Sequence, residues 1–101
     1  MAIVEVSIVP EGTGSTSVSR FVAGAVRVLQ RETAVKYELT GMGTIIEGEL
    51  EKVLALVARM HESAFQAGAQ RVVTSVKIDN RRDKNSSISG KVASVKEKLE
   101  G

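Results

Sequence analysis

The order of two hydrophobic periodicities along the chain is the feature that most constrains the fold. Apolar and polar side chains alternate in four segments, and this period of two predicts four β-strands: residues 2–10, 35–40, 44–48 and 71–79. Apolar side chains recur three and four positions apart in two longer segments, which predicts two amphipathic helices: residues 18–29 and 49–67. The chain therefore has the element order β-α-β-β-α-β.

This order predicts an α+β domain of the ferredoxin-like kind. Right-handed crossovers place both helices on one face of an antiparallel four-stranded sheet in the order 4-1-3-2. The chain has 101 residues, which is the usual size of one domain, so we expect a single domain over 1–101. Hydroxyl residues at 15–17 are candidate caps for the first helix, and Gly68 is placed to end the second. A short C-terminal helix follows, with a narrow apolar stripe: Ile88, Val92, Val95 and Leu99.

The two central strands flank Gly41-Met42-Gly43, which predicts a hairpin with a three-residue loop in which Thr40 pairs with Thr44. With this register, the helices cover one face of the sheet: Val4, Val6, Ile8, Leu39, Ile45, Val72, Val76 and Ile78. The opposite face then carries a mixed set: Ile3, Glu5, Ser7, Val9, Glu38, Thr40, Thr44, Ile46, Val73, Ser75, Lys77 and Asp79.

That mixed face allows two interpretations. Apolar side chains that remain contiguous in water usually mark an interface, which favours a homo-oligomer with its polar residues paired across the contact. Alternatively, the face borders a ligand pocket, in which Glu5 or Glu38 accepts hydrogen bonds from a cationic or amine-bearing small molecule. The alternation leaves both interpretations open.

Composition excludes several classes of function. The chain has no cysteine, so disulfides, thiolate metal sites and cysteine nucleophiles are absent. Aromatic residues make up 3% of the chain and the net charge is +2, so we expect no nucleic-acid partner. Apolar runs are too short to span a membrane, and the N-terminus lacks a targeting pattern, so we expect a cytoplasmic protein without a membrane partner.

Candidate motifs for catalysis or metal binding are weak. The segment 12–17 lies between a strand and a helix, where a phosphate could bind, but it departs from both glycine-rich nucleotide-binding patterns. A loop that ends in a helix cap is the simpler interpretation. His61 is the single histidine and has no second ligand at metal spacing, so we expect it at the surface or the edge of the core. We therefore expect neither a catalytic site nor a metal site.

Three blocks of the sequence resemble the small thiamine-binding, YkoF-like proteins, many of which are known only as uncharacterised proteins. They are Ser7-Ile8-Val9-Pro10 with Gly12-Thr13-Gly14-Ser15-Thr16-Ser17-Val18-Ser19, then residues 37–49 around Glu38-Leu39-Thr40-Gly41-Met42-Gly43-Thr44, then residues 71–84 ending in Asp79-Asn80-Arg81-Arg82-Asp83-Lys84. The blocks span nearly the whole chain in the order of the family. Gly41 is a departure, since many members have proline there.

The resemblance implies a ferredoxin-like fold, homodimers joined through their sheets, and tetramers formed as pairs of dimers. It also implies binding of thiamine or its hydroxymethylpyrimidine part, with no catalysis and no further cofactor. The candidate ligand-binding residues, including Glu5 from the mixed face, are Glu5, Ser7, Thr13, Ser17, Glu38, Thr40, Met42, Thr44 and Glu47. Two other functions remain open: a structural or regulatory oligomerisation domain without a ligand, and an enzyme that acts on a phosphorylated small molecule through the loop 12–17.

Overall fold

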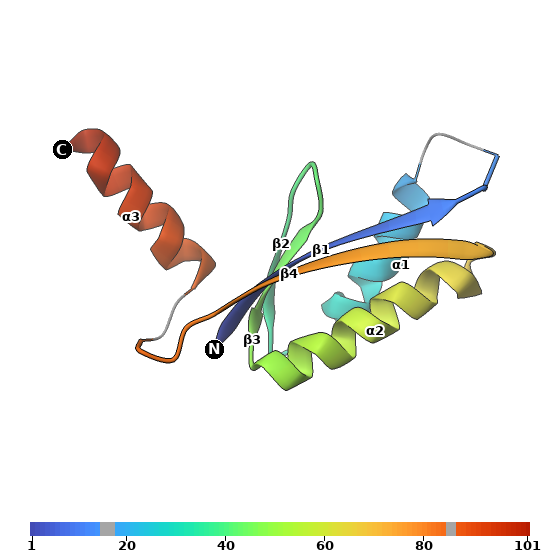
Figure 1. Ribbon diagram of the computed structural model, residues 1–101, viewed down its shortest axis with the longest axis horizontal. Helices are drawn as coiled ribbons and strands as arrows, with labels where there is room; N and C mark the ends of the chain where they lie inside the picture. The colour runs from blue at the N-terminus through green and yellow to red at the C-terminus, as the bar shows by residue number, and fades with distance from the viewer. Residues whose placement is uncertain (15–17, 85–86) are drawn as a thin grey trace.

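A computed structural model describes residues 1–14, 18–84 and 87–101, and it confirms the predicted order of elements (Figure 1). The elements are β1 (Ala2–Glu11), α1 (Ser19–Gln30), β2 (Lys36–Leu39), β3 (Thr44–Gly48), α2 (Leu50–Gln66), β4 (Arg71–Asn80) and α3 (Ile88–Glu100). The predicted caps at residues 15–17 lie outside the described residues. Gly68 ends α2 as predicted, because its positive φ of 106° lets the chain turn back and Ala69 N donate to Ala64 O.

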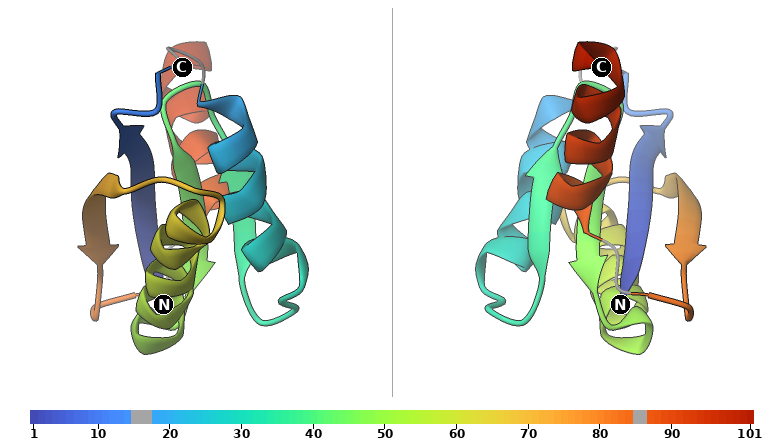
Figure 2. Two further views of the ribbon diagram at one scale, coloured as in Figure 1. Left: turned by 90° about the vertical axis from the view of Figure 1, so that its right-hand side faces the viewer. Right: turned by 90° about the vertical axis from the view of Figure 1, so that its left-hand side faces the viewer.

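The four strands form one antiparallel sheet in the order β2-β3-β1-β4, which is the predicted order. Helices α1 and α2 cover one face, and α3 lies apart from them on the other side of the sheet (Figures 1 and 2). Strand β1 pairs with β4 along its whole length, from Ala2 to Glu11. Its ladder with β3 is shorter and ends where Val6 faces Thr44.

The core between the sheet and the two helices is mainly aliphatic, as the scarcity of aromatic residues predicts, and it also contains the buried ring of Phe21. Its fully buried side chains come from the sheet and from both helices: Val4, Val6, Leu29, Ile46, Val53 and Met60. The spacing of apolar residues in α2 predicts a buried stripe of Leu50, Val53, Leu54, Val57, Met60 and Ala64. This stripe is partly wrong, because Leu56 is buried and Leu54 is 39% exposed. Helix α2 packs against α1 as well as against the sheet, so its buried stripe follows positions 53, 56, 57, 60 and 64.

The predicted faces of β3 are wrong. Leu39 pairs with Thr44, so the hairpin loop has four residues, 40–43, in place of three. Because Ile46 lies opposite Val4, Ile46 and Thr44 are buried under the helices, while Ile45 faces the other side beside Glu5. A shift of one residue moves each side chain of a strand to the opposite face of the sheet.

The face away from α1 and α2, here called the open face, consists of rows of side chains that cross the strands. One row contains Glu38, Ile45, Glu5 and Lys77, and the next contains Lys36, Glu47, Ile3 and Asp79. Farther along, Val9 lies opposite Val73, and both are about two-fifths exposed. The mixed character predicted for this face therefore holds, although Ile45 and Glu47 replace Ile46 and Thr44 on it.

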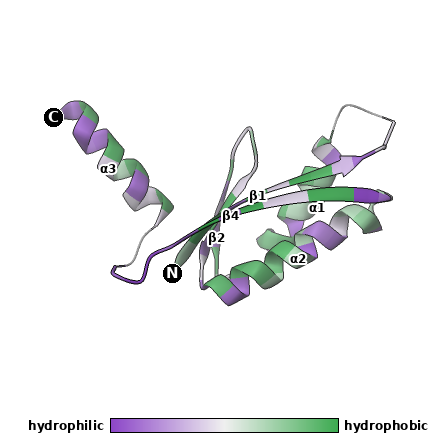
Figure 3. Ribbon diagram, viewed as in Figure 1, coloured by the Kyte–Doolittle hydropathy of each residue, from purple (hydrophilic) through white to green (hydrophobic). Residues whose placement is uncertain are grey.

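Helix α3 is attached to the open face by its first turn. The carboxylate of Glu47, which is only 6% exposed, accepts a hydrogen bond from Ile88 N at 2.8 Å. Ser87 caps the helix through Gly90 N, and Lys91 pairs with Asp79. None of its residues is buried, and hydrophobic and hydrophilic residues alternate along its ribbon (Figure 3). Its predicted stripe is therefore in water, with Val92, Val95 and Leu99 47%, 59% and 80% exposed.

Candidate functional site

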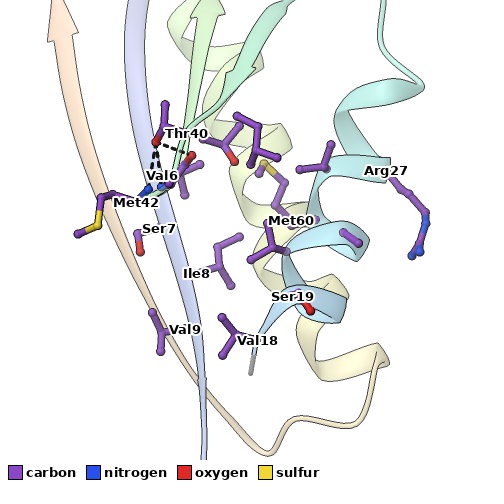
Figure 4. Close-up of a pocket in the computed structure, with 18 of the residues that line it drawn as sticks. Val6, Ser7, Ile8, Val9, Val18, Ser19, Arg27, Thr40, Met42 and Met60 are labelled. Carbon is purple, nitrogen blue, oxygen red and sulfur yellow. Dashed lines mark hydrogen bonds between the residues drawn. The ribbon is translucent and has the colours of Figure 1, made fainter. Parts of the chain in front are cut away.

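The candidate site is a pocket of about 870 Å³ between α1, β1 and the β2–β3 hairpin (Figure 4). Its size falls within the range of small-molecule sites, roughly 300–1,000 Å³. Most of its walls are apolar, from Val6, Ile8, Val18, Val22, Ala25, Val26, Leu39 and Met60. Polar groups lie among them: Ser7, Ser19, Gln30, Thr40 and Thr44.

The pocket exists because the sheet has a gap. Strand β3 accompanies β1 only as far as Val6, whereas β1 continues for five more residues beside β4 alone. Four consecutive residues of β1, 6–9, line the pocket. Ser7 and Val9 point to one side of β1 and Ile8 to the other (Figure 4). A cavity that touches side chains on both sides of a strand reaches the edge of that strand, so the main chain of β1 borders the pocket.

The hairpin loop forms one end of the pocket, and its own hydrogen bonds hold it there. Thr40 Oγ1 donates to Gly43 O at 2.9 Å and accepts from Gly43 N at 3.1 Å. The loop also lies against β1, since a Cβ atom at Gly43 would come within 2.7 Å of Val6 O. The Thr40 hydroxyl is thus already engaged in the turn, and glycine is required at 43 for the close approach.

Thr44 supplies a hydroxyl group without a partner. The residue is 4% exposed and lines the pocket, and within the described part of the chain its side chain makes no hydrogen bond. A buried hydroxyl that lacks a partner destabilises a fold by about 1–3 kcal/mol, so such groups usually have a partner in the functional state. A bound ligand would supply that partner.

The described residues that line the pocket include no carboxylate. Arg27 is the single charged residue among its described lining residues, and its exposed side chain extends away from β1 (Figure 4). The interior is therefore electrically neutral. Its surroundings favour an uncharged, flat and largely apolar group with a few hydrogen-bonding atoms at its edge.

The predicted ligand-binding residues fall into separate places. Four line the pocket: Ser7, Thr40, Met42 and Thr44. Glu5 and Glu38 lie in one row of the open face, and Glu47 holds the first turn of α3. Thr13 lies between β1 and α1 outside the pocket lining, and Ser17 lies outside the described residues.

The apolar walls were not predicted as part of a site. Val18, Val22 and Val26 lie on α1 and Ile8 on β1, and their periodicity is that of ordinary core residues. One feature of the sequence does indicate the gap beside β1, and this is Pro10. Proline has no N–H group, so within a strand it marks a position where one side of the main chain has no hydrogen-bonded neighbouring strand.

The other polar clusters are small. His61 Nδ1 lies 2.6 Å from Thr74 Oγ1, and its ring meets the edge of Phe65, which places it at the rim of the core as predicted. The Arg81 guanidinium donates to the carboxylate of Asp83 and lowers the pKa of Asp83 to about 2. Among the described residues, no group of acidic or histidine side chains could hold a metal ion, and no helix could cross a membrane.

Residues 4–96 match the family model of the thiamine-binding proteins. The chain belongs to this family. Its relatives include the UPF0045 protein YqgV of Bacillus subtilis, 45% identical over 99% of both chains. A UPF0045 protein of Methanothermobacter thermautotrophicus is 46% identical over 98% of this chain and all of the relative.

A crystal structure of protein MJ1052 from Methanocaldococcus jannaschii has the same fold. It superimposes with a TM-score of 0.86 and is 38% identical, covering 95% of this chain and 96% of that one. The family match includes every residue that lines the pocket, together with Glu47 and the first nine residues of α3. The fold and the family implied by the sequence blocks are thereby confirmed.

Proposed function

We propose that this protein binds thiamine or its hydroxymethylpyrimidine part in the pocket beside β1, as a cytoplasmic homo-oligomer and without catalysis. The observation that carries the proposal is an apolar pocket of small-molecule size, in which the buried hydroxyl of Thr44 has no partner among the described residues. The family match supports the choice of ligand.

The pocket chemistry fits one half of thiamine better than the other. The pyrimidine ring is flat and uncharged, so it loses little by leaving water for the apolar walls. The thiazolium ring is cationic and would find no carboxylate inside, so we place it at the opening of the pocket. Met42 is 87% exposed at the tip of the hairpin, and its flexible thioether can pack on a ring that projects from the opening.

Self-association belongs to the same proposal. The open face exposes Val9 and Val73, and α3 exposes a stripe that no described residue of the chain buries. Apolar surfaces of this kind usually mark interfaces. We propose homodimers that join through the open faces, with tetramers as pairs of dimers. Sedimentation of the protein with Val95→Glu and Leu99→Glu tests the contribution of α3: we expect a smaller assembly, and an unchanged mass would contradict it.

Titration calorimetry tests the ligand. We expect saturable heat with both thiamine and hydroxymethylpyrimidine, and weaker binding by Thr44→Val. Thr33→Val is the matched control, because Thr33 is exposed and outside the pocket, and its affinity should be unchanged. If the folded, oligomeric protein gives no heat at millimolar concentrations of either ligand, the proposal is rejected, and a structural oligomerisation domain without a ligand is favoured. In a separate assay, release of phosphate from thiamine phosphate incubated with the protein would reject the absence of catalysis.

A further inference from the structure

The main chain of β1 presents a hydrogen-bonding edge inside the pocket. In an antiparallel sheet, successive residues direct their N–H and C=O groups to alternate sides of the strand. Two observations establish which residues of β1 face the gap left by β3.

The first observation is Pro10. It pairs with Val72 of β4 and yet has no N–H group, and proline is tolerated in a strand where its nitrogen faces away from the neighbouring ladder. The main-chain groups of Pro10 therefore face the gap. The second observation is independent: Val6 O faces β3, because the Gly43 main chain approaches it there.

Ile8 lies midway between these two residues, so its N–H and C=O groups face the same side. At Ile8 the ladder with β3 has already ended, and the residue lines the pocket. Its amide and carbonyl thus form a donor and an acceptor side by side on an otherwise apolar wall. Thr44, whose hydroxyl has no partner among the described residues, lies on the same side of the sheet as the Ile8 side chain.

We infer that the pocket recognises a planar nitrogen heteroaromatic amine, which the edge of β1 binds through the main chain of Ile8. A ring nitrogen next to an exocyclic amino group is the complement of this edge: the nitrogen accepts from Ile8 N–H, and the amino group donates to Ile8 C=O. The Thr44 hydroxyl serves a second polar atom of the ring. The neutral walls explain why a heteroaromatic amine is preferred to a carboxylate or an ammonium group.

This inference rests on the proposed function and makes it more specific, since it assigns recognition to the aminopyrimidine half of thiamine. The thiazolium half, and any phosphate attached to it, lies toward solvent. The ligand should therefore be selected by the pattern of donors and acceptors on the pyrimidine edge, and only weakly by the substituents of the thiazolium ring.

A ligand series in calorimetry tests the inference on the unmodified protein. The probes are thiamine, hydroxymethylpyrimidine, oxythiamine, hydroxyethyl-methylthiazole and 4-amino-2-methylpyrimidine. We expect the two pyrimidines to bind within about tenfold of thiamine and the thiazole not to bind. Oxythiamine replaces the amino group by a carbonyl and reverses both hydrogen bonds, so it should bind at least tenfold more weakly.

Ile8→Pro provides a second test, because it removes the N–H that faces the gap and leaves the ladder with β4 intact. We expect it to abolish the discrimination between thiamine and oxythiamine, while Ile8→Val, which keeps the N–H, retains it. Circular dichroism establishes that each variant is folded. If Ile8→Pro does not fold, the ligand series decides the matter alone.

The outcomes separate the two proposals. Equal affinities for thiamine and oxythiamine, or tight binding of the thiazole, would overturn the inference and leave the proposed function standing. Binding of 4-amino-2-methylpyrimidine without binding of thiamine or hydroxymethylpyrimidine would support recognition of a heteroaromatic amine and reject the proposed ligand. No binding by any of the pyrimidines would reject both.

Discussion

Replacing Thr44 by valine should make the protein more stable and its ligand affinity weaker. The change keeps the branched shape and removes a hydroxyl group from a residue that is only 4% exposed and has no side-chain hydrogen bond among the described residues. An unsatisfied buried hydroxyl costs about 1–3 kcal/mol. Water can enter the pocket beside Thr44, so we take the lower end, about 1 kcal/mol, which corresponds to a rise in Tm of roughly 4 °C for a domain of this size.

Thr74→Val is the matched control, because Thr74 lies on the same side of the sheet but its hydroxyl contacts His61 Nδ1 at 2.6 Å. The same chemical change there breaks a hydrogen bond and leaves a partly buried ring nitrogen unpaired. We expect Thr74→Val to lower the unfolding free energy by about 1 kcal/mol. The two variants should therefore shift Tm in opposite directions.

Thermal unfolding followed by circular dichroism measures both shifts. The protein concentration must be the same for all variants, because the Tm of an oligomer depends on concentration. Calorimetry with hydroxymethylpyrimidine then compares affinities, and the loss of one neutral hydrogen bond should weaken binding roughly fivefold in Thr44→Val. A Thr44→Val variant that is less stable than the parent by about 1 kcal/mol or more would refute the reasoning, since its hydroxyl would then have a partner in the ligand-free protein.

Three further changes probe the hairpin, α3 and the segment after β4. Gly43→Ala should destabilise the protein by about 1–3 kcal/mol, because the new Cβ would lie 2.7 Å from Val6 O. Gly41→Ala is the control and should be nearly neutral, because its Cβ would have no atom within 4 Å. Denaturant unfolding measures both variants, and equal losses of stability would contradict the prediction. Glu47→Ala should speed hydrogen exchange at the Ile88 amide, because that amide loses its acceptor. Glu97→Ala, in the exposed part of α3, is the control and should leave this exchange rate unchanged. If the Ile88 amide stays protected in Glu47→Ala, Glu47 does not hold the first turn of α3. Asp83 should titrate with a midpoint near 2 by carbon-detected NMR, and in Arg81→Ala the midpoint should rise toward the ordinary value of 3.8. Because the pKa of Asp83 is lowered in the folded state, its small stabilising effect is present above pH 4 and is lost as the pH falls toward 2. An unchanged midpoint in the variant would exclude Arg81 as the cause.

The sequence predicted the order of the elements and the sheet because periodicity is a local property. Val4, Val6 and Ile8 alternate with polar residues, and Phe21, Ala25 and Leu29 recur at helical spacing, so each segment identifies its own buried face. The faces of β3 were wrong for a different reason. They depend on whether Thr40 belongs to the strand or to the loop, and its hydrogen bonds to Gly43 decide this. A single residue in the loop thus determined the placement of Thr44 and Ile46.

The site could be predicted only in part, because the pocket forms where the end of β1 is not paired with β3. Ser7, Thr40, Met42 and Thr44 were named for their chemistry, and all four line the pocket. The carboxylates Glu5 and Glu38 were named for their charge and lie on the open face as predicted, but the pocket does not include them. The pocket itself exists because β3 stops at Val6 while β1 continues, and the relative lengths of two ladders are set by tertiary contacts that periodicity does not encode.

Pro10 also protects the protein from an error of assembly. A strand whose edge is left unpaired can recruit a strand from another molecule, which is a common start to aggregation. On the side of β1 that faces the gap, Ile8 offers an amide N–H and Pro10, the next residue with that orientation, offers none. An invading strand could therefore pair with the N–H and C=O groups of Ile8, but at Pro10 its carbonyl would find no donor. Proline at this position thus weakens the edge of β1 as a template for a foreign strand, while the amide of Ile8 stays accessible from the pocket.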